Sequence, residues 1–178
     1  MDAKNEDCTK FKDEYVLTAE KLYGIIKVAA IDCGKEEELC NEEFGVFDIP
    51  QVMIYTEKSG EEGERFKGEM KQPHISRAAT RKMQSFVSIV SNSNYDSFVD
   101  RDRWTKNKVI LFNDKKITPS VYKAHSKKFL GKLDFAETRN SETELIAKFG
   151  IDTFPTLLVL TDPEGFVGDK YTGEMNPD

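Results

Sequence analysis

The chain has 178 residues, of which 38% are hydrophobic and 33% are charged, a composition typical of globular domains. The formal net charge is −6, and lysine and arginine are scattered through both halves, so no basic face favours nucleic acid as a partner. No run is long or apolar enough to span a bilayer, and the N-terminus lacks the apolar core of a signal peptide. We therefore expect no membrane span in this chain, and any secretory targeting segment would lie outside it.

Cysteine and histidine are too few to indicate a metal site. Cys8, Cys33 and Cys40 cannot supply a four-cysteine zinc site or a disulfide-stapled small domain. His74 and His125 have no ligand spacing to each other or to the cysteines. We expect no metal and no cofactor.

Hydrophobic spacing predicts six elements in the first half of the chain. In order they are helix 9–23, a buried strand 25–31, helix 35–44, strand 52–55, a short strand 65–67 that closes a hairpin, and helix 75–90. Gly24 and Gly45 end the first two helices. The polar run 91–94 then predicts a domain boundary.

The second half predicts a similar order. A short segment 95–104 precedes strand 109–112, a helix opened by Thr118 and Pro119 that runs to Leu130, strand 133–136, and a helix whose start carries a capping box of Ser141 and Glu144. A proline, a strand at 156–160 and a hairpin follow. Alternating strands and helices with a final hairpin predict an α/β fold with a mixed sheet.

One stretch occurs twice and links the two halves. A helix ends at Phe44-Gly45 and Pro50 precedes a strand; 105 positions later a helix ends at Phe149-Gly150 and Pro155 precedes a strand. Proline suits a strand start, where it cannot donate to the ladder and holds its predecessor extended. We expect a duplicated domain, and we expect both prolines to be cis.

A family resemblance rests on four features of the first half. They are Cys8 before a helix ending Leu22-Tyr23-Gly24, a strand ending Ile31-Asp32-Cys33, the pair Leu39-Cys40, and Phe44-Gly45 with Pro50 beyond it. This order resembles the a-type thioredoxin domains of the protein disulfide isomerase family. The second half resembles a thioredoxin domain without redox cysteines, and the whole is similar to the thioredoxin region of the J-domain (DnaJ) co-chaperones of the endoplasmic reticulum.

The resemblance implies two tandem thioredoxin-like domains, 1–91 and 95–178, each a mixed β-sheet flanked by helices. It also implies residence in the endoplasmic reticulum lumen and work in oxidative protein folding. The partners would be unfolded or cysteine-containing clients, partner oxidoreductases and chaperones. In the family, a Cys-x-x-Cys pair opens the helix and a cis-proline loop holds substrate backbone, a role that falls here on Ile49 and Pro50.

The sequence departs from the family at the first catalytic position. The stretch reads Asn5-Glu6-Asp7-Cys8, so the second cysteine is present and the first is asparagine. Three hypotheses follow. Cys8 is a buried thiol without chemistry, or a single thiol that forms mixed disulfides, or Asn5 stands where the natural protein has a cysteine. The position equivalent to Cys8 in the second half is Lys115, which excludes thiol chemistry there.

The other two cysteines are predicted to be structural. Cys33 closes a predicted buried strand and Cys40 lies on the inner face of the next predicted helix, so we expect both to be reduced and buried.

Both domains are expected to be incomplete. Aligning Gly24 with Gly131 places Met1 opposite Lys108, so the first copy has no equivalent of strand 109–112. Either residues precede Met1 in the parent protein, or residues 2–5 are a remnant completed by another segment. The second copy stops after its hairpin, where the first continues into helix 75–90.

The sequence thus leaves two functions open. The chain takes part in disulfide isomerase-like exchange or client binding through the single thiol of Cys8, or it is a redox-inactive protein-binding module.

Overall fold

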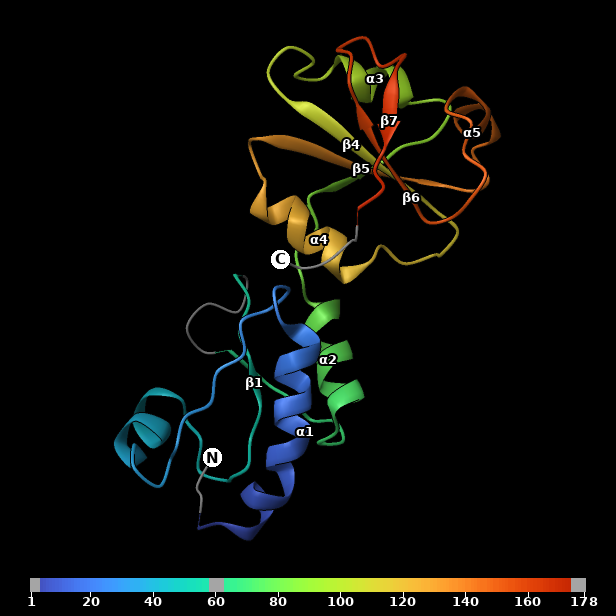
Figure 1. Ribbon diagram of the computed structural model, residues 1–178. Helices are drawn as coiled ribbons and strands as arrows, with labels where there is room; N and C mark the ends of the chain where they lie inside the picture. The colour runs from blue at the N-terminus through green and yellow to red at the C-terminus, as the bar shows by residue number, and fades with distance from the viewer. Residues whose placement is uncertain (1–3, 58–62, 174–178) are drawn as a thin grey trace. The chain divides into compact units, whose positions relative to one another are not determined.

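The computed structural model describes residues 4–57 and 63–173, and the chain divides into two compact units, Met1–Met83 (unit 1) and Gln84–Asp178 (unit 2) (Figure 1). Both units contain helices and strands, so the predicted mixed α/β class is confirmed. Within the described residues, no helix has both the length and the apolar character needed to cross a membrane.

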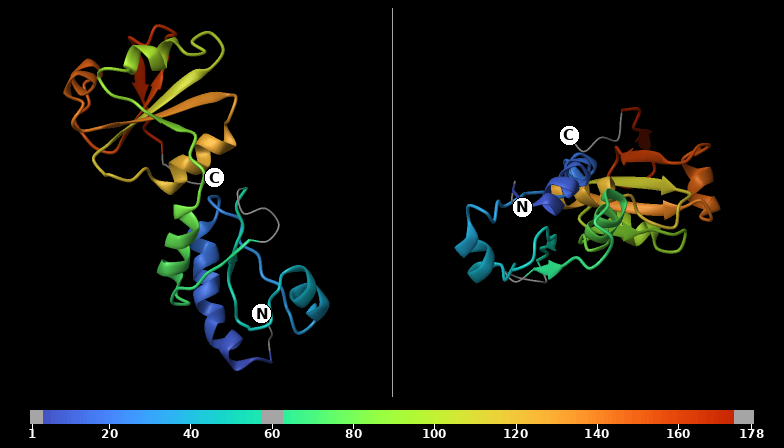
Figure 2. Two further views of the ribbon diagram at one scale, coloured as in Figure 1. Left: turned by 180° about the vertical axis from the view of Figure 1, so that it is seen from behind. Right: turned by 90° about the horizontal axis from the view of Figure 1, so that it is seen from below.

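Unit 2 is built on a five-stranded mixed sheet of order β3-β5-β4-β6-β7 (Figures 1 and 2). The strands are β3 (Val87–Ile89), β4 (Asn107–Asn113), β5 (Leu133–Arg139), β6 (Thr156–Leu160) and β7 (Gly168–Lys170). β3, β5 and β4 are parallel, whereas β6 and β7 are antiparallel to their neighbours. The predicted strands at 109–112, 133–136 and 156–160 and the final hairpin are confirmed.

β4 is the central strand, paired with β5 on one edge and β6 on the other, and both of its faces are covered. Ile110 and Phe112 face one side of the sheet, in the cluster that includes residues of α3 (Tyr95–Asp100) and α5 (Thr143–Lys148). Val109 and Leu111 face the other side, where Tyr122 of α4 (Ser120–Lys128) packs. A strand buried on both faces reads as a continuous apolar run, which is why residues 109–112 were recognisable in the sequence.

A charged side chain lies in the middle of this sheet. Glu137 on β5 is fully buried, and its carboxylate accepts hydrogen bonds from Asn113 Nδ2 at 2.6 Å, Arg139 Nη1 at 2.7 Å and the Thr118 hydroxyl. Buried charge is tolerated because it is paired and hydrogen-bonded. Thr118 therefore does not cap α4 as predicted, since Glu137 takes its hydroxyl and Pro119 occupies the N-cap position.

Unit 1 is smaller and consists mainly of two helices and a two-stranded sheet. Its elements are α1 (Glu6–Leu22), the π-helical turn η1 (Leu39–Glu43), β1 (Met53–Ile54), β2 (Glu64–Arg65) and α2 (Gln72–Arg81). Phe11, Val52 and Ile75 form the core where α1, the approach to β1, and α2 meet. The Glu14 carboxylate of α1 accepts the Gln72 amide at 2.8 Å and so supplies the cap that the first turn of α2 lacks.

The predicted strand 25–31 is wrong. Residues 25–31 have no strand geometry, and Lys27, Ala29 and Ala30 are exposed. A strand is held by a ladder to a neighbouring strand, and the described part of unit 1 contains only the β1–β2 pair, whose members bond to each other. The apolar run is present, but the partner that would order it as a strand is not among these residues.

The predicted helix 75–90 is also wrong in its second half. α2 ends at Arg81, and Val87–Ile89 forms β3 of unit 2, with the Val90 amide donating to the Glu137 carbonyl at 2.9 Å. β-branched residues favour a strand once an edge is available, and β5 provides that edge.

The predicted capping box at the start of α5 does not form. Glu142 is the N-cap residue of α5 and makes no capping bond, and the Ser141 hydroxyl contacts the Glu142 carboxylate at 3.4 Å. Asn92, distant in sequence, caps the helix instead, since its Oδ1 accepts the Leu145 amide at 3.3 Å. The predicted helix end at Phe149-Gly150 and the two cis prolines are confirmed, with Ile49-Pro50 and Phe154-Pro155 both cis and Gly150 at φ 58°.

Candidate functional site

Cys8 lies in the first turn of α1 and is the one free cysteine of the chain. The residue is 2% exposed, so its thiol is shielded from solvent. Asn5, in the place of the family's first cysteine, is the N-cap of the helix, and its Oδ1 accepts the Cys8 amide at 3.0 Å. Asparagine therefore has a structural role at this position, which the sequence analysis missed although Asn is a preferred N-cap residue.

The charges around Cys8 stabilise the helix start. Glu6 and Asp7 occupy the first turn, where acidic side chains interact favourably with the helix dipole. Lys10 pairs with Glu6 at 2.8 Å, and all three of these charged side chains are largely exposed. Such exposed pairs contribute little to stability individually.

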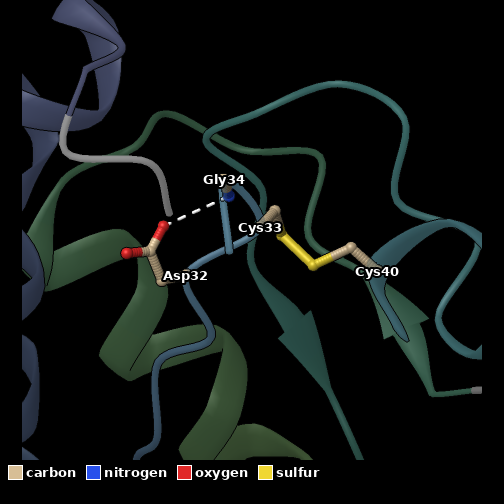
Figure 3. The surroundings of a disulfide bond; sticks show 4 residues. All are labelled: Asp32, Cys33, Gly34 and Cys40. Atoms are coloured by element: carbon tan, nitrogen blue, oxygen red, sulfur yellow. Dashed lines mark hydrogen bonds between the residues drawn. A yellow bond between two sulfur atoms is a disulfide. The ribbon is translucent and has the colours of Figure 1, made fainter. Parts of the chain in front are cut away.

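Cys33 and Cys40 form a disulfide, so the prediction that both are reduced is wrong. The S–S distance is 2.06 Å and the Cα atoms lie 5.7 Å apart (Figure 3). Cys40 is buried as expected, and Cys33 is partly buried.

The fold-back that brings these cysteines together begins at Asp32. Its Oδ1 accepts the Gly34 amide at 3.2 Å (Figure 3), and its carbonyl accepts the amides of Lys35 and Glu36. The Cys40 amide then donates to the Glu36 carbonyl at 3.0 Å. The turn at Asp32 and the helical turn that follows it therefore bring Cys40 back to Cys33.

An apolar groove of about 390 Å³ runs along unit 1. Its walls come from α1, residues 26–31, the stretch that leads into β1, and α2; they include Phe11, Leu22, Ile26, Ile49, Val52 and Ile75. Ile49, predicted to bind substrate, lies in this wall. Pro50 and Cys8 are not lining residues, so the groove does not unite the three predicted site residues.

A hydrogen bond from Tyr15 joins α1 to residues 26–31 in the groove wall. Its hydroxyl donates to the Ala29 carbonyl at 2.7 Å, and burial raises the pKa of the phenol. In unit 2 the Tyr122 hydroxyl donates to the Ala136 carbonyl at the same distance and also contacts the Val109 carbonyl of β4 at 3.0 Å. Tyr15 and Tyr122 are as far apart in the sequence as Ala29 and Ala136, and as Gly24 and Gly131. The internal repeat could therefore have predicted this matching pair of hydrogen bonds.

The equivalent of Cys8 in unit 2 is not a site. The Lys115 amide donates to Asn113 Oδ1 at 3.1 Å, and its carbonyl accepts from Arg139, so this stretch secures the loop around Glu137. Among the residues that the structure describes, no three histidine, cysteine or acidic side chains gather as metal ligands.

A Dictyostelium discoideum protein whose name marks it as a candidate protein disulfide-isomerase is 33% identical to the chain over 173 residues. The chain resembles the protein disulfide isomerase family. The alignment covers 94% of this chain and 42% of the relative, so the chain spans less than half the length of that protein. No family model matches the chain.

Solved structures give the same resemblance at the level of the fold. The crystal structure of full-length ERdj5 matches 99% of the chain and 27% of its own length, with a TM-score of 0.63 and 13% identity. A second ERdj5 crystal form matches 99% of the chain and 25% of its own length, with a TM-score of 0.62 and 12% identity. At this identity the likeness concerns the fold, which is similar to the thioredoxin-like domains of ERdj5.

Proposed function

We propose that the chain assists oxidative protein folding in the endoplasmic reticulum lumen, as a protein disulfide isomerase-like module with one slow thiol. Unfolded or cysteine-containing clients are the substrates, and partner oxidoreductases or chaperones complete the reaction. The observation that carries the proposal is the position of Cys8 in the first turn of α1, one turn beyond Asn5. The 33% identity to a candidate protein disulfide-isomerase supports it.

The proposal includes two tandem thioredoxin-like domains. The sequence placed them at 1–91 and 95–178, but Val87–Ile89 is β3 of unit 2, so we propose the boundary at Met83–Gln84, where the chain divides. Unit 2 supports it with a mixed sheet whose central strand is β4. Unit 1 supports it with equivalent parts, since the Tyr15 and Tyr122 hydrogen bonds match and a cis proline precedes both β1 and β6.

In this scheme the Cys8 thiolate attacks one sulfur of a client disulfide. A Cys8–client disulfide forms, the client S–S bond breaks, and the other client sulfur leaves as a thiolate. In a Cys-x-x-Cys pair the neighbouring thiol would release the client, but Asn5 has no thiol and Cys33 is bonded to Cys40. Release therefore requires a thiol from the client or from a partner oxidoreductase. We assign Ile49 and Pro50 to holding client backbone.

Burial of Cys8 limits the rate at which mixed disulfides form. At 2% exposure, Cys8 meets a client sulfur only when the first turn of α1 opens, so adducts form slowly. For the same reason a partner thiol reaches the adduct slowly, and the mixed disulfide is long-lived. This kinetic profile suits retention of clients better than rapid turnover.

The same burial favours one alternative, a redox-inactive module that binds proteins without thiol chemistry. The two functions differ in whether Cys8 is required. The test is recovery of mixed disulfides from cells that express the chain or its Cys8→Ala variant, together with an insulin-reduction assay.

We expect adducts with the unchanged chain, none with Cys8→Ala, and insulin reduction near background for both. Asn5→Cys is the matched gain-of-function variant, because it restores two thiols at the spacing of the family and should raise insulin reduction well above background. Client binding that is unchanged in Cys8→Ala, with no adducts from the unchanged chain, would leave the binding module. Robust turnover by the unchanged chain would contradict the slow-thiol scheme.

A further inference from the structure

We propose that the Cys33–Cys40 disulfide is a site of thiol–disulfide exchange that controls the proline loop, residues 46–50. In the oxidised state the bond holds η1 and, through it, the start of the loop. In the reduced state η1 loosens and the loop is released. The exchange is independent of Cys8 chemistry. Its effect on clients rests on the proposed function, which assigns the loop to client backbone.

The disulfide is linked to the proline loop through the backbone at the end of η1. Cys40 lies in η1, and its bond to Cys33 joins η1 to the turn at Asp32 (Figure 3). The Cys40 carbonyl accepts the Val46 amide at 2.8 Å, over a glycine, Gly45, whose φ is 59°. A bond closed over a glycine of positive φ sets the direction in which the chain leaves a helix. The position of Cys40 therefore sets the entry to the loop.

Unit 2 builds the same helix end without a disulfide. The spacing of the repeated proline motif places Leu145 of α5 opposite Cys40 and Ile151 opposite Val46. Leu145 is the buried residue of α5, and both Leu145 and Ile151 belong to the apolar core of unit 2. Within the described residues, the apolar cluster of unit 1 includes neither Cys40 nor Val46. η1 thus relies on a covalent bond where α5 relies on packing.

Reduction weakens the hold on η1. The element has five residues, and a helical segment of that length is not stable in water by itself. A free cysteine behaves as a small apolar side chain, so a reduced Cys40 gains less from burial than Leu145 does. The Phe44 ring also contacts Tyr55, with centroids 6.2 Å apart, and this contact does not depend on the disulfide. We therefore expect local loosening of η1 and the loop entry, and no detachment of the chain.

The sulfur open to attack is that of Cys33, which is partly buried, whereas Cys40 is 2% exposed. The thiolate of an incoming thiol attacks the Cys33 sulfur, the S–S bond breaks, and Cys40 leaves as a thiolate that takes a proton from water. A second thiolate then attacks the incoming sulfur in this mixed disulfide. It frees Cys33 and leaves the two reductant molecules joined as a disulfide. Glutathione is such a reductant, and glutathione disulfide reverses both steps.

The test uses the Cys8→Ala chain, in which Cys33 and Cys40 are the remaining cysteines. The chain is equilibrated without denaturant in buffers of different ratios of glutathione to glutathione disulfide. Alkylation and mass spectrometry give the reduced fraction. Hydrogen exchange followed by NMR gives the exchange rate of the Val46 amide in each buffer.

We expect reversible reduction in native buffer. The Val46 amide should exchange roughly fifty-fold faster in the reduced chain, because the cross-link restricts the locally opened state as well. This rate should not rise in urea below the unfolding transition, since a local opening exposes little new surface. Two controls are matched. The Ile151 amide, which donates to the Ile146 carbonyl at 3.0 Å at the equivalent helix end of unit 2, should not change. Cys33→Ala/Cys40→Ala on the same background should exchange fast at Val46 in every buffer.

Three results would overturn the proposal. The first is a disulfide that glutathione reduces only when urea unfolds unit 1. The second is a Val46 amide whose exchange is the same in the oxidised and reduced chains. The third is exchange at Val46 that depends on urea as steeply as exchange in α2, because reduction would then destabilise unit 1 as a whole without releasing the loop.

Binding of an unfolded probe separates this inference from the proposed function. Fluorescein-labelled carboxymethylated α-lactalbumin, which has no free thiol, is titrated into the oxidised and the reduced Cys8→Ala chain and followed by anisotropy. We expect binding to the oxidised chain to be about tenfold tighter, because its loop is already ordered. Equal binding in both states would overturn control of clients by the disulfide. Absence of binding in both states, with redox-dependent exchange at Val46, would contradict the client role and support the exchange site.

Discussion

Reduction of the Cys33–Cys40 disulfide should lower the stability of unit 1 and leave that of unit 2 unchanged. The bonded cysteines are seven positions apart, and the chain-entropy relation for a loop of that length gives about 2.4 kcal/mol at 25 °C. That is roughly a fifty-fold rise in the unfolded fraction of unit 1. Reduction adds no bulk, so the loss of the cross-link dominates.

The assay is urea unfolding followed by hydrogen exchange of peptides from α1 and β4, with and without a reductant. Peptides of α1 should shift to lower urea on reduction, while those of β4 serve as an internal control because unit 2 has no cysteine. Cys8→Ala should respond as the unchanged chain does, and Cys33→Ala/Cys40→Ala should not respond to reductant at all. A chain whose α1 peptides do not shift, although mass spectrometry shows the disulfide to be reduced, would refute the reasoning.

Three further predictions concern single side chains. Glu14→Gln should lower the melting temperature at pH 7, because the Gln72 amide and then Lys71 hold the pKa of Glu14 below its usual value. This stabilisation is complete above about pH 5 and is lost as the pH falls through the lowered pKa, so the melting temperatures of the two proteins should converge in acid below that pKa. Arg139→Met should destabilise unit 2 by about 3 kcal/mol in urea unfolding, since it leaves the buried charge of Glu137 without its cation, and a loss under about 1 kcal/mol would contradict that role. Tyr122→Phe should cost about 1 to 2 kcal/mol in the same measurement, because it removes the hydroxyl that bonds two strand carbonyls; an unchanged unfolding midpoint would show that this bond contributes nothing net.

Local rules determined much of unit 2 from the sequence. The apolar run 109–112 is a strand because its residues are buried on both faces, and Gly150 ends α5 because glycine readily adopts a positive φ. The repeated proline motif placed both cis peptide bonds correctly. These features could be predicted because each leaves a short pattern in the sequence: a continuous apolar run, a glycine after a helix, and a proline before a strand.

The thiol site was only partly readable in the same way. The family resemblance placed Cys8 at the start of a helix, and a buried thiol was one of the three hypotheses for it. The capping role of Asn5 could have been predicted, because asparagine directly before a helical pattern is a preferred N-cap residue.

Tertiary structure decided the rest through partners distant in the chain. Residues 25–31 have the composition of a buried strand and do not form one. A strand must pair with a neighbouring strand, and none of the described residues of unit 1 pairs with this segment. Residues 87–89 fit a helix by spacing and became β3, because β5 offers an edge some 50 residues away in sequence. Cys33 and Cys40 join because the turn at Asp32 and the helical turn that follows it bring their Cα atoms within 5.7 Å, a local backbone geometry that the spacing of the two cysteines did not indicate.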